Sequence, residues 1–227
     1  IGEIGGIVPI VLLGLFLCWL CVFFCIFKGV ETVGKVVLLT VPVPIVLLVI
    51  FIVRGVTLPG AVEGLKFFLT PDFSALANPK VWLAAYGQVF FSLSIGFGVM
   101  IAYASFLPKD SDIVNNAFIS SFADALISFI AGLAVFSALG YLAFSTGKPV
   151  TEVVSSGPGL AFVTFPAIIG MLPFWAAAFG VLFFLLLLTL GIDSAFSLVE
   201  AGVAGAMDKW KHACIVVNAV ISFIAFA

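Results

Sequence analysis

Charged side chains are scarce in this chain. They make up 9% of its 227 residues, whereas a soluble domain carries about 25%. The sequence has 9 Lys and Arg against 11 Asp and Glu and a single His, so it cannot form the basic face that a nucleic-acid-binding protein needs. The scarcity of charge also excludes a soluble enzyme and a disordered chain, because both need much more polar surface.

Hydrophobic residues make up most of what is present. They account for 64% of the chain, and the mean hydropathy is +1.38, which is too apolar for one water-soluble core. The apolar runs are long enough for membrane-spanning helices and lack the alternating polarity of transmembrane β-strands. We therefore predict an all-α polytopic membrane protein whose partner is the lipid bilayer.

A single transmembrane domain is predicted, with spans at about residues 7–27, 36–53, 81–106, 116–144, 172–201 and 213–227. Two long connections, 54–80 and 145–171, follow the second and the fourth span. The apolar half of the second connection, Gly159 to Met171, is too short to cross a bilayer, so we expect a re-entrant or surface hairpin there. The chain starts without Met and stops inside an apolar run, so we expect an internal piece of a longer protein.

The distribution of Lys and Arg sets the predicted orientation. The short loops after the first, third and fifth spans carry Lys28, Lys35, Lys109, Lys209 and Lys211. The two much longer connections carry Arg54, Lys66, Lys80 and Lys148. Because cytoplasmic loops are enriched in basic residues, we predict that the short loops are cytoplasmic and that the two long connections are extracellular.

Two acidic residues, Asp124 and Asp193, lie well inside predicted spans. No Lys or Arg lies inside a predicted span to neutralise them, and an ionisable group within a membrane needs a partner or a function. Each aspartate is therefore either protonated and hydrogen-bonded to a neighbouring helix, or paired with a bound cation or with a residue outside this chain.

The third predicted span contains a poor helix-forming stretch near its middle. Every second position there is small, with Ser92 and Ser94 followed by Gly96 and Gly98. Two Ser and two Gly within seven residues disfavour a continuous helix. A helix broken at the membrane midplane offers carbonyl groups to a cation and a half-helix N-terminus to a carboxylate, as in the binding sites of secondary transporters. The alternative is an ordinary helix crossing that packs through small residues.

The fifth predicted span supplies a second group of oxygen atoms. Asp193 and Ser194 follow Gly191 and Ile192 there, so that a carboxylate lies next to a hydroxyl. Hard oxygen ligands with one negative charge suit an alkali cation. Sodium is the predicted ion, and a proton carried on Asp193 is the alternative.

Several motifs resemble the neurotransmitter:sodium symporter family, whose fold is LeuT-type. QVFFSLSIGFGVMIAYASF resembles the unwound sixth helix of that family, and LTLGIDSAFSLVEA resembles the eighth. Three loops agree: KGVETVGKVV resembles the one between helices four and five, LPGAVEGLKFFLTPDFSALANPKVW the third extracellular loop, and GPGLAFVTFP the fourth. The resemblance implies part of a five-plus-five inverted-repeat sodium symporter, from helix four to part of helix nine, without the N-terminal helices that complete its sites.

The resemblance also implies roles for individual residues. Ser92 and Asp124 fall at the first sodium site of the family, and the Leu190 carbonyl with the Asp193 and Ser194 side chains falls at the second. The residues at substrate-binding positions are Phe91, Ser92, Ser94, Gly96, Phe97, Ser194 and Leu198. Phe91 also matches the aromatic lid over the substrate, and Asp208 matches the acid of the cytoplasmic gate.

The chain departs from the family pattern at three positions. Phe106 stands where the family has a Tyr near the gate, and Asp124 stands where most members have Asn. Relatives that work without chloride often carry an acid one turn after that position, where this chain has Ser128. Because Asp124 already supplies a negative charge beside the first sodium site, we expect no requirement for chloride.

The sequence therefore predicts a sodium-coupled symporter of hydrophobic L-amino acids such as Leu, Phe, Tyr or Trp, most similar to bacterial members, in the cell membrane and specifically a bacterial inner membrane. It needs no cofactor besides its coupling ions and is not an enzyme. A proton-coupled transporter of the same fold is the alternative. An intramembrane aspartyl protease is a weaker alternative, because Ile192 stands where the motif of that family needs Gly. A channel is also a weaker alternative, because it would need a continuous polar stripe and these spans contain isolated polar clusters.

Overall fold

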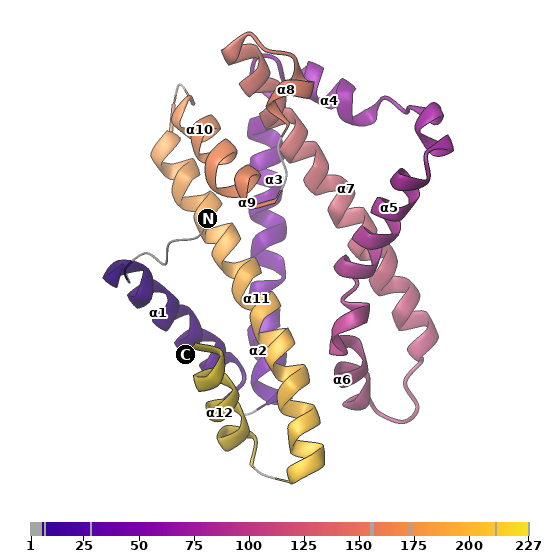
Figure 1. Ribbon diagram of the computed structural model, residues 1–227, viewed down its shortest axis with the longest axis vertical. Coiled ribbons are helices and arrows are strands. Elements are labelled where there is room, and N and C mark those ends of the chain that lie inside the picture. Colours follow the sequence, from indigo (N-terminus) through magenta and orange to yellow (C-terminus); the bar gives the residue numbers. More distant parts are fainter. Residues whose placement is uncertain are drawn as a thin grey trace. The chain divides into compact units, whose positions relative to one another are not determined.

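The computed structural model describes residues 6, 8–27, 29–154, 157–172, 174–211 and 213–226, without the side chains of Val30 and Glu31. Lys28 and the outer ends of the first and last predicted spans, Ile7 and Ala227, lie outside the described residues. Within the described ranges the chain forms helices and no strands (Figure 1). This confirms the predicted all-α fold class.

The main helices follow one another along the chain in an order that Figure 1 traces by colour. They are α1 (Pro9–Cys25), α2 (Val30–Thr40), α3 (Pro42–Val56), α4 (Ala61–Leu69), α5 (Pro79–Ser92), α6 (Val99–Ser105), α7 (Ile113–Thr146), α11 (Ala176–Trp210) and α12 (Cys214–Phe226). Three described segments are long and apolar enough to cross a membrane, namely Thr32–Val56, Ile113–Thr146 and Ala176–Trp210.

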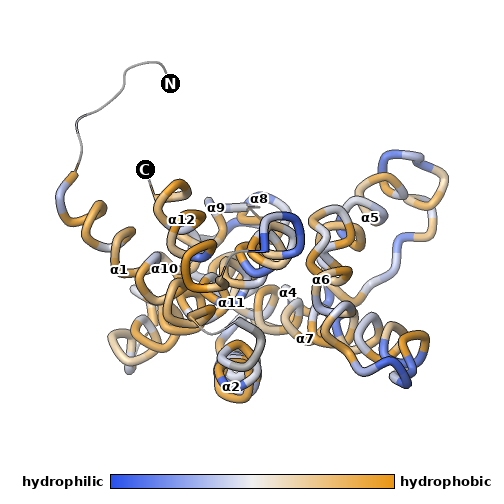
Figure 2. The backbone as a smooth tube through the Cα atoms, turned by 90° about the horizontal axis from the view of Figure 1, so that it is seen from below, coloured by the Kyte–Doolittle hydropathy of each residue, from blue (hydrophilic) through white to orange (hydrophobic). Residues whose placement is uncertain are grey.

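Large apolar side chains on these helices are exposed. Ile10, Leu38 and Ile101 are each about three-quarters exposed, and Figure 2 shows hydrophobic residues along most of the tube. A helix that is apolar all round is covered either by protein or by lipid. The exposed apolar surface is therefore the expected surface of a multi-pass membrane protein.

The chain forms two compact units. The first unit consists of residues 1–41, 94–111 and 188–227, and the second of residues 42–93 and 112–187. The helix α11 supplies residues to both units, as does the segment from α2 to α3.

The core of the first unit lies between α1, α2, α11 and α12. Its buried residues are Val22, Ile26, Val33, Phe196, Val199, Val203 and Val217. The contact between α1 and α12 also has a polar component, because the amide Nδ2 of the fully buried Asn218 donates to the carbonyl of Phe23 at 3.1 Å. A buried amide with a backbone partner satisfies its hydrogen bonding without water.

The core of the second unit lies between α3, α7, the helix α10 (Phe165–Gly170) and the first part of α11. Leu58, Leu139, Ile168 and Phe183 are buried in it. The Tyr141 hydroxyl donates to the Met171 carbonyl at 2.6 Å, which fixes the end of α10 against α7.

The helix α4 packs very closely against α7. A Cβ atom on Gly140 would lie 2.5 Å from the carbonyl oxygen of Gly60, and one on Gly64 would meet the backbone of Phe136 and Gly140. The ring of Phe68 stacks on Phe136 with 4.8 Å between centroids. The two glycines therefore allow a close helix crossing, of the kind that small residues give in membranes.

The segment from Gly159 to Met171 differs from the prediction. A short helix α9 (Gly157–Gly159), a π turn (Leu160–Thr164) and α10 follow directly on one another, so that the apolar half is a single helical segment and not a hairpin. The π turn ends next to Phe165 and Pro166, where the proline cannot donate a helical hydrogen bond. The rest of this connection includes α8 (Val150–Val153).

The connection before α5 contains a short 3₁₀ helix, Phe73–Ala77. The side chain of Asp72 caps it, because Oδ1 accepts hydrogen bonds from the Ser74 hydroxyl at 2.5 Å and from the Ser74 backbone N–H at 2.9 Å. These two hydrogen bonds lower the pKa of Asp72, and the bond from the Ser74 hydroxyl has the larger effect.

The predicted break in the third span is confirmed. The helix α5 ends at Ser92, a short 3₁₀ turn covers Ile95–Phe97, and α6 begins at Val99. Ser94 and Gly98 have φ angles of 53° and 72°, in the left-handed region that ends a helix. Glycine adopts this region freely and serine does so at an energetic cost, so the chain between α5 and α6 leaves the helical path at these two residues.

Candidate functional site

The first candidate site lies in the second unit, at the last residue of α5. The Ser92 hydroxyl lies 2.9 Å from Oδ1 and 2.8 Å from Oδ2 of Asp124 on α7. Both side chains are half-buried. One hydroxyl proton is shared between two carboxylate oxygens, so lone pairs remain on both residues. These oxygens are the type of ligand that an alkali cation takes.

The second candidate site lies in the first unit, on α11. Leu190 and Ser194 are four residues apart and therefore lie on one face of the helix, with Asp193 beside them. Asp193 is half-buried, and its Oδ1 accepts a hydrogen bond from the Thr40 hydroxyl at 2.7 Å. The arrangement offers a carboxylate and a hydroxyl in one turn of an apolar helix.

Sequence reasoning missed Thr40. It is the last residue of α2 and contacts a carboxylate 153 positions further along the chain. One signal could have found it, since Thr40 carries the only polar side chain in the apolar run 36–53. A single hydroxyl in such a run needs a partner, as do the two aspartates within the predicted spans.

A second chain of hydrogen bonds reaches Asp193 from α6. The Tyr103 hydroxyl donates to the Ser197 hydroxyl at 3.1 Å, and Ser197 donates to the backbone carbonyl of Asp193 at 2.9 Å. The part of the broken helix that follows the break is thereby connected to the turn of α11 that carries the aspartate.

The residues at substrate-binding positions divide between the two units. Phe91 and Ser92 belong to the second unit, and Ser94, Gly96, Phe97, Ser194 and Leu198 belong to the first. The rings of Phe91 and Phe97 are 66% and 49% exposed, and Leu198 is 46% exposed. Asp208 is exposed near the end of α11.

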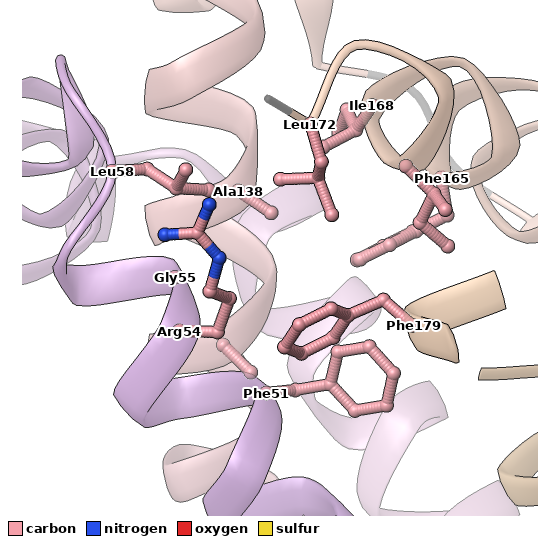
Figure 3. Close-up of a pocket in the computed structure, with 11 residues that line it drawn as sticks. Phe51, Arg54, Gly55, Leu58, Ala138, Phe165, Ile168, Leu172 and Phe179 are labelled. Carbon is pink, nitrogen blue, oxygen red and sulfur yellow. The ribbon is translucent and has the colours of Figure 1, made fainter. Parts of the chain in front are cut away.

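A cavity in the second unit is a separate feature. It is lined by Phe51, Arg54, Leu58, Phe165, Phe179 and neighbouring apolar residues, and Figure 3 shows the Phe51 and Phe179 rings side by side at its wall. Its volume is about 30 Å³, whereas pockets for small molecules measure about 300–1,000 Å³. None of the predicted site residues lines this cavity, so it is too small and wrongly placed to be an amino-acid site.

The described residues contain no cluster of three or more His, Cys, Asp or Glu side chains. A transition-metal or zinc centre of the usual kind needs such a set of ligands. Asp124 and Asp193 instead each combine one carboxylate with a hydroxyl partner, and such hard oxygen groups are the ligand type of an alkali cation.

Comparison with known proteins identifies relatives over almost the whole chain. The chain is 45% identical over 210 residues to an uncharacterised sodium-dependent transporter of Methanocaldococcus jannaschii, covering 92% of this chain and 43% of the relative. It is 44% identical over 210 residues to the creatine transporter of Torpedo marmorata and 42% identical over 208 residues to a sodium-dependent dopamine transporter of Caenorhabditis elegans. Each alignment covers 92% of this chain and 34% of the relative.

A solved structure agrees with these relatives. The crystal structure of MhsT in complex with L-phenylalanine matches with a TM-score of 0.77 and 34% identity, covering 94% of this chain and 47% of MhsT. The chain thus spans less than half the length of the relatives that it matches. This match confirms the inverted-repeat fold implied by the sequence motifs.

The family comparison agrees with the resemblance drawn from the motifs. The profile described as the sodium:neurotransmitter symporter family matches residues 1–227. The named relatives are transporters and not enzymes, which sets aside the aspartyl-protease alternative. The chain belongs to the sodium:neurotransmitter symporter family.

Proposed function

We propose that the protein is a sodium-coupled symporter that carries hydrophobic L-amino acids across the cell membrane by alternating access. The observation that carries the proposal is the pair formed by Ser92 and Asp124, a carboxylate and a hydroxyl at the break between α5 and α6. No Lys or Arg lies within the predicted spans to neutralise Asp124 or Asp193. A monovalent cation is the partner that such carboxylates can take and release.

Two sodium sites follow from this proposal. The first uses the side-chain oxygens of Ser92 and Asp124, and the second uses the Leu190 carbonyl with the Asp193 and Ser194 side chains. Each site combines one negative charge with neutral oxygens. Sodium bound at each would neutralise a carboxylate inside the membrane, so ion binding and the ordering of the broken helix would favour each other.

The proposed substrate site surrounds the broken helix. By the family resemblance, Phe91, Phe97 and Leu198 would supply apolar contacts to it, Gly96 has no side chain to fill the space, and Ser94 would offer a hydroxyl. No charged side chain among the substrate-binding positions could pair with a charged substrate side chain. The crystal structure of the similar MhsT holds L-phenylalanine, which supports a bulky hydrophobic substrate such as Leu, Phe, Tyr or Trp.

Two gates complete the proposed cycle. Phe91 would close over the substrate on the extracellular side, and Asp208 would close the cytoplasmic side through a basic partner outside this chain. Release of one gate while the other is closed gives alternating access. We place the protein in the cell membrane, specifically a bacterial inner membrane, with the short basic loops in the cytoplasm.

Uptake by the complete transporter in proteoliposomes tests the proposal. Radiolabelled leucine should accumulate under an inward sodium gradient and should not accumulate when choline replaces sodium. A proton gradient imposed without sodium separates the proton-coupled alternative, since it would then drive uptake equally well. Uptake that is the same with and without sodium would overturn the proposed coupling.

A further inference from the structure

The hydrogen bond between Thr40 and Asp193 differs from those that hydroxyls usually make inside helices. Ser and Thr inside a helix commonly donate to the carbonyl four residues before them. In this chain Ser121, Ser137 and Thr146 donate to carbonyls of their own helix, α7. The Thr40 hydroxyl instead reaches from the end of α2 to a carboxylate on α11, at 2.7 Å.

Packing holds Thr40 in place for this contact. Val33, Val36 and Val37 lie on the same face of α2 as Thr40, at the three- and four-residue spacing of a helix. These three valines pack in the core of the first unit together with Ile192 on α11. The stripe that buries α2 in this core therefore also keeps the hydroxyl on the face of α2 that points into the core.

The contact leaves part of the carboxylate free. Thr40 donates to Oδ1 of Asp193, and a carboxylate has about four positions that can accept a hydrogen bond or a cation. A hydrogen bond to a charged group is also about twice as strong as one between neutral groups. Thr40 can therefore hold the orientation of the Asp193 side chain while Oδ2 remains available to an ion.

We propose that Thr40 is a positioning residue of the sodium site at Asp193, which it prepares for the ion without belonging to the family-derived ligand set. The inference rests on the proposed sodium coupling and adds a residue to it. Without the Thr40 hydroxyl, Asp193 samples more side-chain rotamers, and sodium binding has to order it. Sodium affinity should fall, and substrate affinity at saturating sodium should not.

Two substitutions at Thr40 and a matched control test this proposal in the complete transporter. Thr40→Val keeps the branched shape and removes the hydroxyl, and Thr40→Ser keeps the hydroxyl. Thr146→Val makes the same chemical change at a hydroxyl that donates to its own helix. The measurements are the half-saturating sodium concentration for leucine uptake and the rise in Tm that sodium alone produces in the purified protein.

We expect Thr40→Val to raise the half-saturating sodium concentration about tenfold, from the loss of a hydrogen bond to a charged group. It should shift the sodium dependence of Tm in parallel and leave the leucine KM at saturating sodium unchanged. Thr40→Ser and Thr146→Val should stay within about twofold of the wild type. If Thr40→Val does not reach the membrane, Thr40→Ala carries the same expectation.

The possible results separate this proposal from the proposed function. If wild-type uptake depends on sodium and Thr40→Val leaves that dependence unchanged, the positioning role is wrong and the sodium symport stands. An equal shift in Thr40→Ser also overturns the positioning role, because the hydroxyl is then not the cause. If wild-type uptake does not depend on sodium, the proposed function itself is wrong.

Discussion

The Ser92 hydroxyl lies 2.9 and 2.8 Å from the two carboxylate oxygens of Asp124. This contact joins the residue at which α5 ends to the interior of α7. Because Ser92 also precedes the left-handed residue Ser94, the end of the helix and the carboxylate are in direct contact. Any ion that Asp124 binds would therefore act on the break itself.

Asp124 leads to a prediction about chloride. An anion within about 5 Å of the carboxylate would meet a repulsion of about 3 kcal/mol at an effective dielectric constant of about 20. We therefore expect leucine uptake to continue when gluconate replaces chloride at constant sodium. Asp124→Asn should either abolish coupling or create a chloride requirement. Ser92, Gln88 one turn before it on α5, and Ser128 one turn after residue 124 on α7 would still offer groups to an anion. Loss of wild-type uptake in gluconate would contradict this role of Asp124.

Asp193 gives a second prediction. Asp193→Asn preserves the size of the side chain and removes its charge, so a bound sodium ion loses its strongest ligand. The half-saturating sodium concentration for uptake should rise by well over tenfold, or by at least about 1.4 kcal/mol in binding free energy. Titration of leucine uptake with sodium measures it, with Asp112→Asn at the start of α7 as a charge-matched control. An unchanged sodium dependence would show that Asp193 does not bind the ion.

The break and both aspartates could be predicted from the sequence because each is visible in local composition. Ser94 and Gly98 disfavour helix, and an acid in an apolar run is conspicuous. The contact partners are harder to predict, since sequence spacing does not show which helices become neighbours. Thr40 and Asp193 lie 153 positions apart, and they meet because α2 and α11 contribute to the same buried core.

The helical segment Gly157–Gly170 shows a second limit of sequence reasoning. A hairpin was predicted there, but the chain continues as one helical segment through Pro166 without turning back. The close crossing of α4 and α7 also escaped notice. A glycine can occur in a helix for several reasons. Only the close approach of Gly64 to the backbone of Phe136 and Gly140 shows that this glycine allows a close helix crossing.

The proposed substrate pocket gives a third prediction. Because no charged side chain lies among the substrate-binding positions, a charged substrate side chain would lose its hydration without gaining a partner. Phe, Leu, Tyr or Trp should compete with labelled leucine far better than Asp, Glu or Lys do. Gly96→Leu should reduce uptake of these bulky amino acids more than uptake of alanine. Preferential displacement of leucine by lysine or glutamate would refute the apolar pocket.

The crossing of α4 and α7 gives a prediction about stability that is independent of transport. Gly64→Ala places a Cβ atom against the backbone of Phe136 and Gly140, which cannot move aside as a flexible side chain could. The two helices must separate, and overpacking of this kind destabilises a protein by about 1–3 kcal/mol.

Gly87→Ala in α5 is the matched control for this prediction. No atom lies within 4 Å of the position that its added methyl group would take, and alanine favours helix. Thermal unfolding of the purified transporter should therefore show a lower Tm for Gly64→Ala and an equal or higher Tm for Gly87→Ala. Equal Tm values for Gly64→Ala and the wild type would mean that α4 and α7 do not cross as closely as this structure shows.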